Sequence, residues 1–137
     1  MRILSIDYGK KRTGLAVTDP LQIVAGGLVT VDTHTLFDYL KEYTSREQVE
    51  RIVIGKPMQP NGQPSENLVR VEQFVKRWRK AMPQIPIEYY DERVSSVLAH
   101  RAMIDGGLKK KDRQNKGLVD EISATIILQD YMRWRQR

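Results

Sequence analysis

Acidic residues at three places in the chain could carry chemistry. Asp7 ends an apolar run near the N-terminus, and Asp120 lies in an apolar C-terminal segment. Asp91 and Glu92 follow another short apolar run. Carboxylates that crowd together are costly unless a cation sits between them. If these acids converge, Mg²⁺ or Mn²⁺ is the expected cofactor, because hard divalent cations prefer oxygen ligands.

Such a site would be suited to hydrolysis of a nucleic-acid backbone. Two divalent cations about 3.5–4 Å apart could activate water and stabilise the leaving oxygen of a phosphodiester. The sequence has no cysteine, which excludes disulfides, thiolate nucleophiles and Cys-ligated zinc. Its two histidines, His34 and His100, lie on predicted helices away from the strand ends, so a Ser-His-Asp triad has no natural candidate.

Each acid also has a purely structural interpretation. Asp7 stands before Tyr8 and a glycine, where aspartate often accepts turn hydrogen bonds. Ser95 fits the N-cap of a helix, so the Asp91-Glu92 cluster could simply precede that helix. Asp120 in a first helical turn would complement the helix dipole, worth about 0.3–1 kcal/mol. Only the three places taken together favour catalysis.

The charge balance favours a polyanionic partner. The chain has 23 lysines and arginines against 17 acids, a formal net charge of +6. Phosphate neutralisation by such residues releases counterions and drives nucleic-acid binding. A basic run precedes the C-terminal helix and could grip phosphates, although it would equally suit a solvated loop. Its members are Lys109, Lys110, Lys111, Arg113 and Lys116.

The elements that position the acids follow from hydrophobic periodicity. The first third predicts an antiparallel meander of strands over residues 2–8, 12–18 and 23–31, with a tight turn at 9–11. Alternation in the first strand puts Asp7 on the face of Ile3 and Ser5, opposite Leu4 and Ile6. Asp7 therefore leaves the sheet on a defined side.

The remaining pattern alternates helices and strands. Thr33 or Thr35 could cap a helix running to about Tyr43. Further strands are expected over residues 51–55 and 86–90, and helices over 65–78, 95–103 and 116–134, with a linker over 106–117. On the last helix, the apolar stripe headed by Asp120 and a second apolar stripe opposite predict cover on two sides.

This order predicts an α/β fold with a five-stranded mixed sheet, its first three strands antiparallel, and helices on both faces. The prediction is one domain over residues 1–137. If the strands that end at Asp7 and Asp91 are neighbours, their acids meet outside the carboxyl ends of the strands. No segment is long enough to span a bilayer and the opening run is too short for a signal peptide, so we expect a cytoplasmic protein without a membrane partner.

Four motifs in this order resemble the YqgF (RuvX) family of pre-16S ribosomal RNA nucleases, relatives of the Holliday-junction resolvase RuvC. The resemblance covers nearly the whole chain. The motifs are Ile6-Asp7-Tyr8-Gly9 with Arg12 and Gly14; Val53-Ile54-Gly55-Lys56-Pro57 with Asn61-Gly62; Asp91-Glu92-Arg93 with Ser95; and Lys116-Gly117 with Val119, Asp120, Ser123, Ala124, Ile127 and Leu128.

The resemblance implies a ribonuclease H-like fold, Mg²⁺-dependent nuclease activity and maturation of the 5′ end of small-subunit ribosomal RNA. It implies that Asp7, Glu92 and Asp120 are the catalytic and metal-binding acids, with Asp91 as the alternative to Glu92. Related resolvases take their second acid from the end of the fourth strand. This chain has Lys56 there, so the role shifts to the Asp91-Glu92 pair.

Basic residues near these acids are the expected phosphate contacts. Arg12, Arg93 and Lys116 would steady phosphate oxygens around the cut. Lys56 stands where the family more often has an apolar residue, and is either a further phosphate contact or an ordinary surface residue.

Two other functions stay open at this stage. The chain could be a resolvase of branched DNA, or a nucleic-acid-binding module whose acids are structural. The sequence does not decide between RNA and DNA, or between endonuclease and exonuclease action. Resolvases of similar fold act as dimers, which leaves a homodimer open.

Overall fold

A single mixed sheet organises the protein. The computed structural model describes residues 1–57, 65–91 and 116–135. The strands are β1 (Arg2–Asp7), β2 (Arg12–Thr18), β3 (Ala25–Asp32), β4 (Val49–Lys56) and β5 (Ile87–Asp91). Their order is β3-β2-β1-β4-β5, with antiparallel pairing among β1, β2 and β3 and parallel pairing from β1 to β4 to β5. The predicted five-stranded mixed sheet is confirmed.

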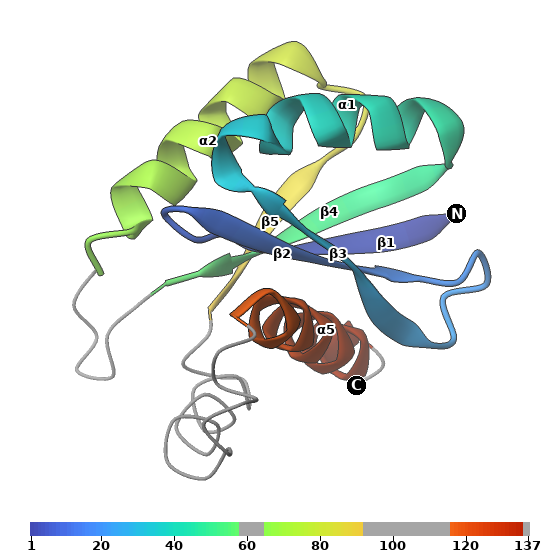
Figure 1. Cartoon of the computed structure of the whole chain (residues 1–137). Coiled ribbons are helices and arrows are strands. Elements are labelled where there is room, and N and C mark those ends of the chain that lie inside the picture. The colour runs from blue at the N-terminus through green and yellow to red at the C-terminus, as the bar shows by residue number, and fades with distance from the viewer. Residues whose placement is uncertain (58–64, 92–115, 136–137) are drawn as a thin grey trace, which may run out of the picture.

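Helices cover both faces of this sheet, as predicted. They are the short 3₁₀ turn η1 (Thr33–Thr35), α1 (Leu36–Arg46), α2 (Leu68–Ala81) and α5 (Lys116–Arg135). The helices α1 and α2 lie together on one face, and α5 crosses the other (Figure 1). Among the residues that the structure describes, no helix has the length and apolar character needed to cross a membrane.

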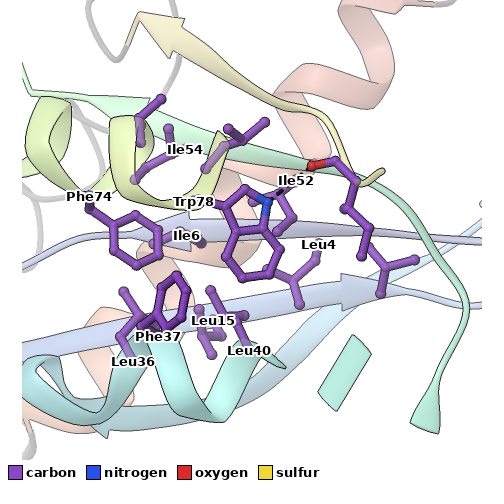
Figure 2. Close-up of a cluster of buried hydrophobic side chains, with 14 of the residues drawn as sticks. Leu4, Ile6, Leu15, Leu36, Phe37, Leu40, Ile52, Ile54, Phe74 and Trp78 are labelled. Carbon is purple, nitrogen blue, oxygen red and sulfur yellow. Dashed lines mark hydrogen bonds between the residues drawn. The ribbon is translucent and has the colours of Figure 1, made fainter. Parts of the chain in front are cut away.

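The larger hydrophobic cluster lies between the sheet and the α1–α2 layer. Figure 2 shows side chains from both helices meeting those of the strands, among them Leu36, Phe37, Leu40, Phe74 and Trp78 over Leu4, Ile6, Leu15, Ile52 and Ile54. Trp78 is fully buried, and its indole N–H donates to the Ile85 carbonyl at 3.0 Å. A buried polar group keeps a partner in this way, so the ring adds apolar burial without an unsatisfied donor.

Alternation along β1 divides its residues between two clusters. Leu4 and Ile6 belong to the larger cluster, whereas Ile3 packs in a second cluster against α5. Ser5 also faces α5, because its Oγ donates to the Ala124 carbonyl at 2.6 Å. Asp7 continues the Ile3–Ser5 face and therefore lies on the α5 side, which confirms the face predicted from the sequence.

Because of the turn between β2 and β3, strand β3 begins later in the sequence than predicted. The Asp19 carboxylate accepts backbone N–H groups from Leu21 at 3.2 Å and from Ile23 and Val24 at 2.8 Å each. These bonds, with that from Val24 the strongest, hold the pKa of Asp19 below its usual value. Because Asp19 accepts hydrogen bonds from their backbone N–H groups, Ile23 and Val24 belong to the turn, where their side chains are exposed. The predicted strand start at residue 23 was wrong, and β3 begins at Ala25.

Helix α1 begins after Thr35, one of the two predicted caps, and ends later than predicted. Thr35 occupies the N-cap position, but its hydroxyl donates to the Asp32 carbonyl at 2.7 Å and makes no cap hydrogen bond. The helix continues past Tyr43 to Arg46, which pairs with Glu42 one turn earlier at 3.0 Å. The helix expected over residues 95–103 lies outside the described residues, as does most of the linker expected over 106–117.

Candidate active site

A glycine on β2 allows the α5 turn that carries Asp120 to pass close to the residue that pairs with Asp7. Gly14 is the cross-strand partner of Asp7 in the β1–β2 ladder. Helix α5 passes so close that a Cβ on Gly14 would lie 2.1 Å from the Asp120 carbonyl oxygen. Because directly opposed residues of antiparallel strands present their side chains on one face, Asp7 leaves the sheet beside the α5 turn that carries Asp120. Asp7 and the α5 turn that carries Asp120 therefore lie on the same face of the sheet, at the carboxyl end of β1.

Helix α5 presents Asp120 at the head of a buried stripe, as predicted. Ala124 and Ile127 are fully buried against the sheet, and Tyr131 is 2% exposed. The opposite stripe behaves differently: Ile122 and Ile126 are half-buried. Within the described residues α5 is fully covered on one side only, so the prediction of cover on two sides was wrong there. The side of α5 that carries Asp120 is therefore the side packed against the sheet.

Asp120 has an arginine partner from β2. Arg12 Nε donates to Asp120 Oδ2 at 3.5 Å, with the two side chains 39% and 26% exposed. Arg12 is an expected phosphate contact, and in the structure its ion-pair partner is the candidate catalytic acid. A cation there offsets the repulsion between Asp120 and the neighbouring Asp7.

The turn after Asp7 is fixed by hydroxyl groups. Thr33 Oγ1 donates to the Gly9 carbonyl at 2.7 Å, and Thr13 Oγ1 accepts the Gly9 N–H at 3.5 Å. These hydroxyls are 2.9 Å apart and hydrogen-bond to each other. A Cβ at Gly9 would lie 2.2 Å from the Arg12 carbonyl, so this tight turn requires glycine. The predicted turn at residues 9–11 is confirmed.

Asn67 holds the same segment from the other face of the sheet. Its side-chain amide donates to the Tyr8 carbonyl at 2.6 Å. The Tyr8 ring packs on Phe74 of α2, with 5.6 Å between ring centroids. Burial raises the pKa of the Tyr8 phenol, which Arg70 partly offsets, so the phenol stays neutral near pH 7. Sequence reasoning missed Asn67, because the predicted helix over residues 65–78 placed it inside the first turn, whereas α2 begins at Leu68 with Asn67 at the N-cap position.

Substitution of Asn67 distinguishes its hydrogen bond to the Tyr8 carbonyl from a role as the N-cap of α2. It occupies the N-cap position of α2 but makes no cap hydrogen bond. Asn67→Asp keeps the shape and suits a cap equally well, yet presents an oxygen to the Tyr8 carbonyl. We expect both Asn67→Asp and Asn67→Ala to lower the free energy of unfolding by about 1 kcal/mol, measured by urea denaturation. An Asn67→Asp protein as stable as the parent would assign Asn67 to capping alone.

The parallel strands β4 and β5 end at the same edge as β1. Lys56 and Asp91 are partners at the ends of β4 and β5. Because β4 separates β1 from β5, the condition that the strands ending at Asp7 and Asp91 be neighbours is not met. Asp91 therefore stands one strand further from Asp7 than that condition required. Lys56 lies between them, with its ammonium 5.9 Å from the centroid of the Tyr89 ring.

Asp7, Asp120 and the alternative Asp91 are the expected metal-binding acids that lie within the described residues. Asp7 and Asp120 supply carboxylate oxygens on one face, which fits a hard divalent cation. Among the described residues, no group of three or more histidines, aspartates and glutamates could hold a metal ion. The expected third acid, Glu92, lies outside the described residues. So do the expected phosphate contacts Arg93, Lys109, Lys110, Lys111 and Arg113, and Lys116 is the first residue of α5.

Comparison with known sequences identifies related proteins over nearly the full chain. The RuvX family model, described as a Holliday junction resolvase, matches residues 1–134. A Phocaeicola vulgatus protein named "Putative pre-16S rRNA nuclease" is 65% identical over 131 residues, covering 96% of this chain and 94% of that protein. A Flavobacterium johnsoniae protein of the same name is 56% identical, covering 96% of this chain and 95% of that protein.

Solved structures share the fold. Thermus thermophilus RuvC in complex with a Holliday junction substrate aligns with a TM-score of 0.61 and 19% identity, covering 99% of this chain and 96% of RuvC. Fowlpox virus resolvase in complex with Holliday junction DNA aligns with a TM-score of 0.59 and 14% identity, covering 100% of both chains. The expected ribonuclease H-like fold is confirmed.

Proposed function

Because the chain belongs to the RuvX family, we propose that it is a metal-dependent nuclease that cuts pre-16S ribosomal RNA. The observation that supports the proposal is the close approach of the α5 turn bearing Asp120 to Gly14, the cross-strand partner of Asp7. Two carboxylates on one face of a nuclease fold have the chemistry to hold Mg²⁺ or Mn²⁺. We further propose that residues 1–137 act as one domain, in the cytoplasm.

In this proposal each acid has a defined task. Asp7 and Asp120 hold the cation between β1 and α5, and Glu92 completes the site, with Asp91 as its alternative. A cation held by these acids would supply an activated water and stabilisation of the leaving oxygen of the phosphodiester. Arg12 keeps the Asp120 carboxylate in position through the 3.5 Å contact. The turn after Asp7 keeps that carboxylate at the edge of the sheet.

Basic residues around the acids would bind the substrate backbone. Lys10 and Lys11 are exposed in the turn that follows Asp7, and Lys56 lies at the end of β4. Positive charge beside the reacting phosphate binds nucleic acid without reading its sequence. The sequence-predicted contacts Arg93, Lys109, Lys110, Lys111, Arg113 and Lys116 belong to the same proposal.

Two other functions each have an observation in their favour. The family description and the junction-bound structural relatives favour a resolvase of branched DNA. The ion pair between Arg12 and Asp120 favours a binding module, because an arginine can satisfy a structural acid without any metal. The preferred substrate distinguishes an RNA nuclease from a resolvase, and the effect of a metal chelator distinguishes an enzyme from a binding module.

The proposal is tested by a cleavage assay with labelled precursor RNA that spans the 5′ end of 16S ribosomal RNA. We expect cleavage in Mg²⁺ that EDTA abolishes and that fresh Mg²⁺ restores. A four-way DNA junction in a parallel reaction should be cut more slowly. Faster cleavage of the junction would establish the resolvase. Binding without cleavage of either substrate, unchanged by EDTA, would establish the binding module.

A further inference from the structure

A groove lies between α2 and β5. Its volume is about 510 Å³, and its charged lining comes from α2, with Glu72, Lys76 and Arg79. Tyr89 of β5 lines the same groove. None of these four residues has a role at the carboxyl ends of β1, β4 and β5, where Asp7 and Asp91 lie; we call this region the acidic edge of the sheet.

Positive charge gathers along the groove. Arg79 and Lys56 both lie on Tyr89, each with its charged group 5.9 Å from the ring centroid. Arg79 is also anchored, because it donates to the Ile87 carbonyl at 3.0 Å. Lys76 is exposed and forms no ion pair within the described part of the chain. An aromatic ring that holds two cations keeps both at the groove wall.

One acid opposes these cations. Burial raises the pKa of the Tyr89 phenol, the negative charge of Glu72 raises it further, and Arg79 lowers it. Glu72 therefore acts electrostatically on the same ring that gathers Arg79 and Lys56. Among the described residues that line the groove, Glu72 is the one acid beside Lys76 and Arg79, and Lys56 adds a third cation at the Tyr89 ring, so this lining suits a polyanion better than a cation.

The strand register connects the groove to the acidic edge. Tyr89 pairs with Ile54 in the β4–β5 ladder, and Lys56 pairs with Asp91 at its end. Lys56 thus lies within cation–π distance of the Tyr89 ring in the groove, and it also stands at the carboxyl end of β4, beside the end of β1 with Asp7. A chain of phosphates that passes the edge can continue along Lys56, Arg79 and Lys76.

We propose that the α2–β5 groove binds the phosphate backbone of the substrate strand where it leaves the acidic edge. The identity of the occupant rests on the proposed nuclease function. Contacts of this kind position a strand without reading its bases, so binding should depend on salt rather than on sequence. Apolar lining from Val69 and Val75 adds a surface for sugars and bases.

The test uses a fluorescent single-stranded RNA and anisotropy in EDTA, so that cleavage does not contribute. We expect Lys76→Gln to raise Kd roughly threefold and to reduce the slope of log K against log salt by about 0.7. Glu72→Gln, which removes the opposing charge, should lower Kd about threefold. Lys41→Gln, a matched charge loss at an exposed position on α1, should leave Kd within about 1.5-fold.

Equal effects of Lys76→Gln and Lys41→Gln, or no tightening with Glu72→Gln, would overturn the groove proposal. So would displacement of the RNA by polyglutamate as readily as by unlabelled RNA, because the site would then accept any polyanion. These results leave the nuclease proposal untouched, since its test is cleavage. Conversely, a protein that cuts nothing but shows the three expected shifts keeps the groove as a nucleic-acid site.

Discussion

We expect Asp7→Asn to remove most of the cleavage activity while the protein stays folded. The substitution keeps the shape of the side chain and removes the charge that a divalent cation requires. Loss of one ligand withdraws several kcal/mol of transition-state stabilisation, and about 3 kcal/mol corresponds to a rate loss of about 100-fold. We expect at least that loss in single-turnover cleavage of precursor RNA. The free energy of unfolding should change by less than about 1 kcal/mol.

A matched control separates this effect from a general loss of negative charge. Asp38 is an exposed acid on α1, on the opposite face of the sheet from α5. Asp38→Asn should cleave at the parental rate. If Asp7→Asn cleaves at the parental rate after a second purification step that excludes contaminating nuclease, the assignment of Asp7 is wrong.

Gly14→Ala should damage both stability and cleavage. The added Cβ would lie 2.1 Å from the Asp120 carbonyl oxygen and 2.3 Å from its carbonyl carbon. Both are backbone atoms, so no side-chain rotation relieves the overlap and α5 must shift as a unit. Overpacking of this kind costs about 1–3 kcal/mol. The shift also moves Asp120 away from Asp7, so cleavage should fall at least about tenfold, in the range of a misplaced catalytic group.

Gly26→Ala is the control for this prediction. Gly26 lies on β3, and a Cβ there would meet nothing within 4 Å. Its free energy of unfolding, measured by urea denaturation, should equal or slightly exceed that of the parent. A Gly14→Ala protein with parental stability and activity would contradict the close approach of α5 to β2 on which the site depends.

Local periodicity predicted the parts of the site that depend on one element at a time. Alternation along β1 gave the face of Asp7, because successive residues of a strand point to opposite sides. Helical spacing gave the buried stripe below Asp120, including Ala124 and Tyr131. The structure confirms both predictions, because each concerns a continuous segment with one buried face.

Contacts between distant elements could not be predicted in this way. Arg12 and Asp120 are 108 residues apart, and nothing in either segment indicates the other. The position of β4 between β1 and β5 depends on which parallel strands pair, and β4 has the same apolar pattern in either order. Asn67 falls inside the helix predicted over residues 65–78, and only the folded chain shows its amide on the Tyr8 carbonyl.

The most direct test of a shared metal site is anomalous diffraction from crystals soaked in Mn²⁺. We predict a peak about 2.1 Å from one carboxylate oxygen of Asp7 and one of Asp120, a distance typical of octahedral divalent sites. The peak should be absent in crystals of Asp7→Asn prepared in the same way. Carboxylate oxygens of Asp7 and Asp120 directed to different sides of the molecule, with Mn²⁺ bound elsewhere, would contradict the site.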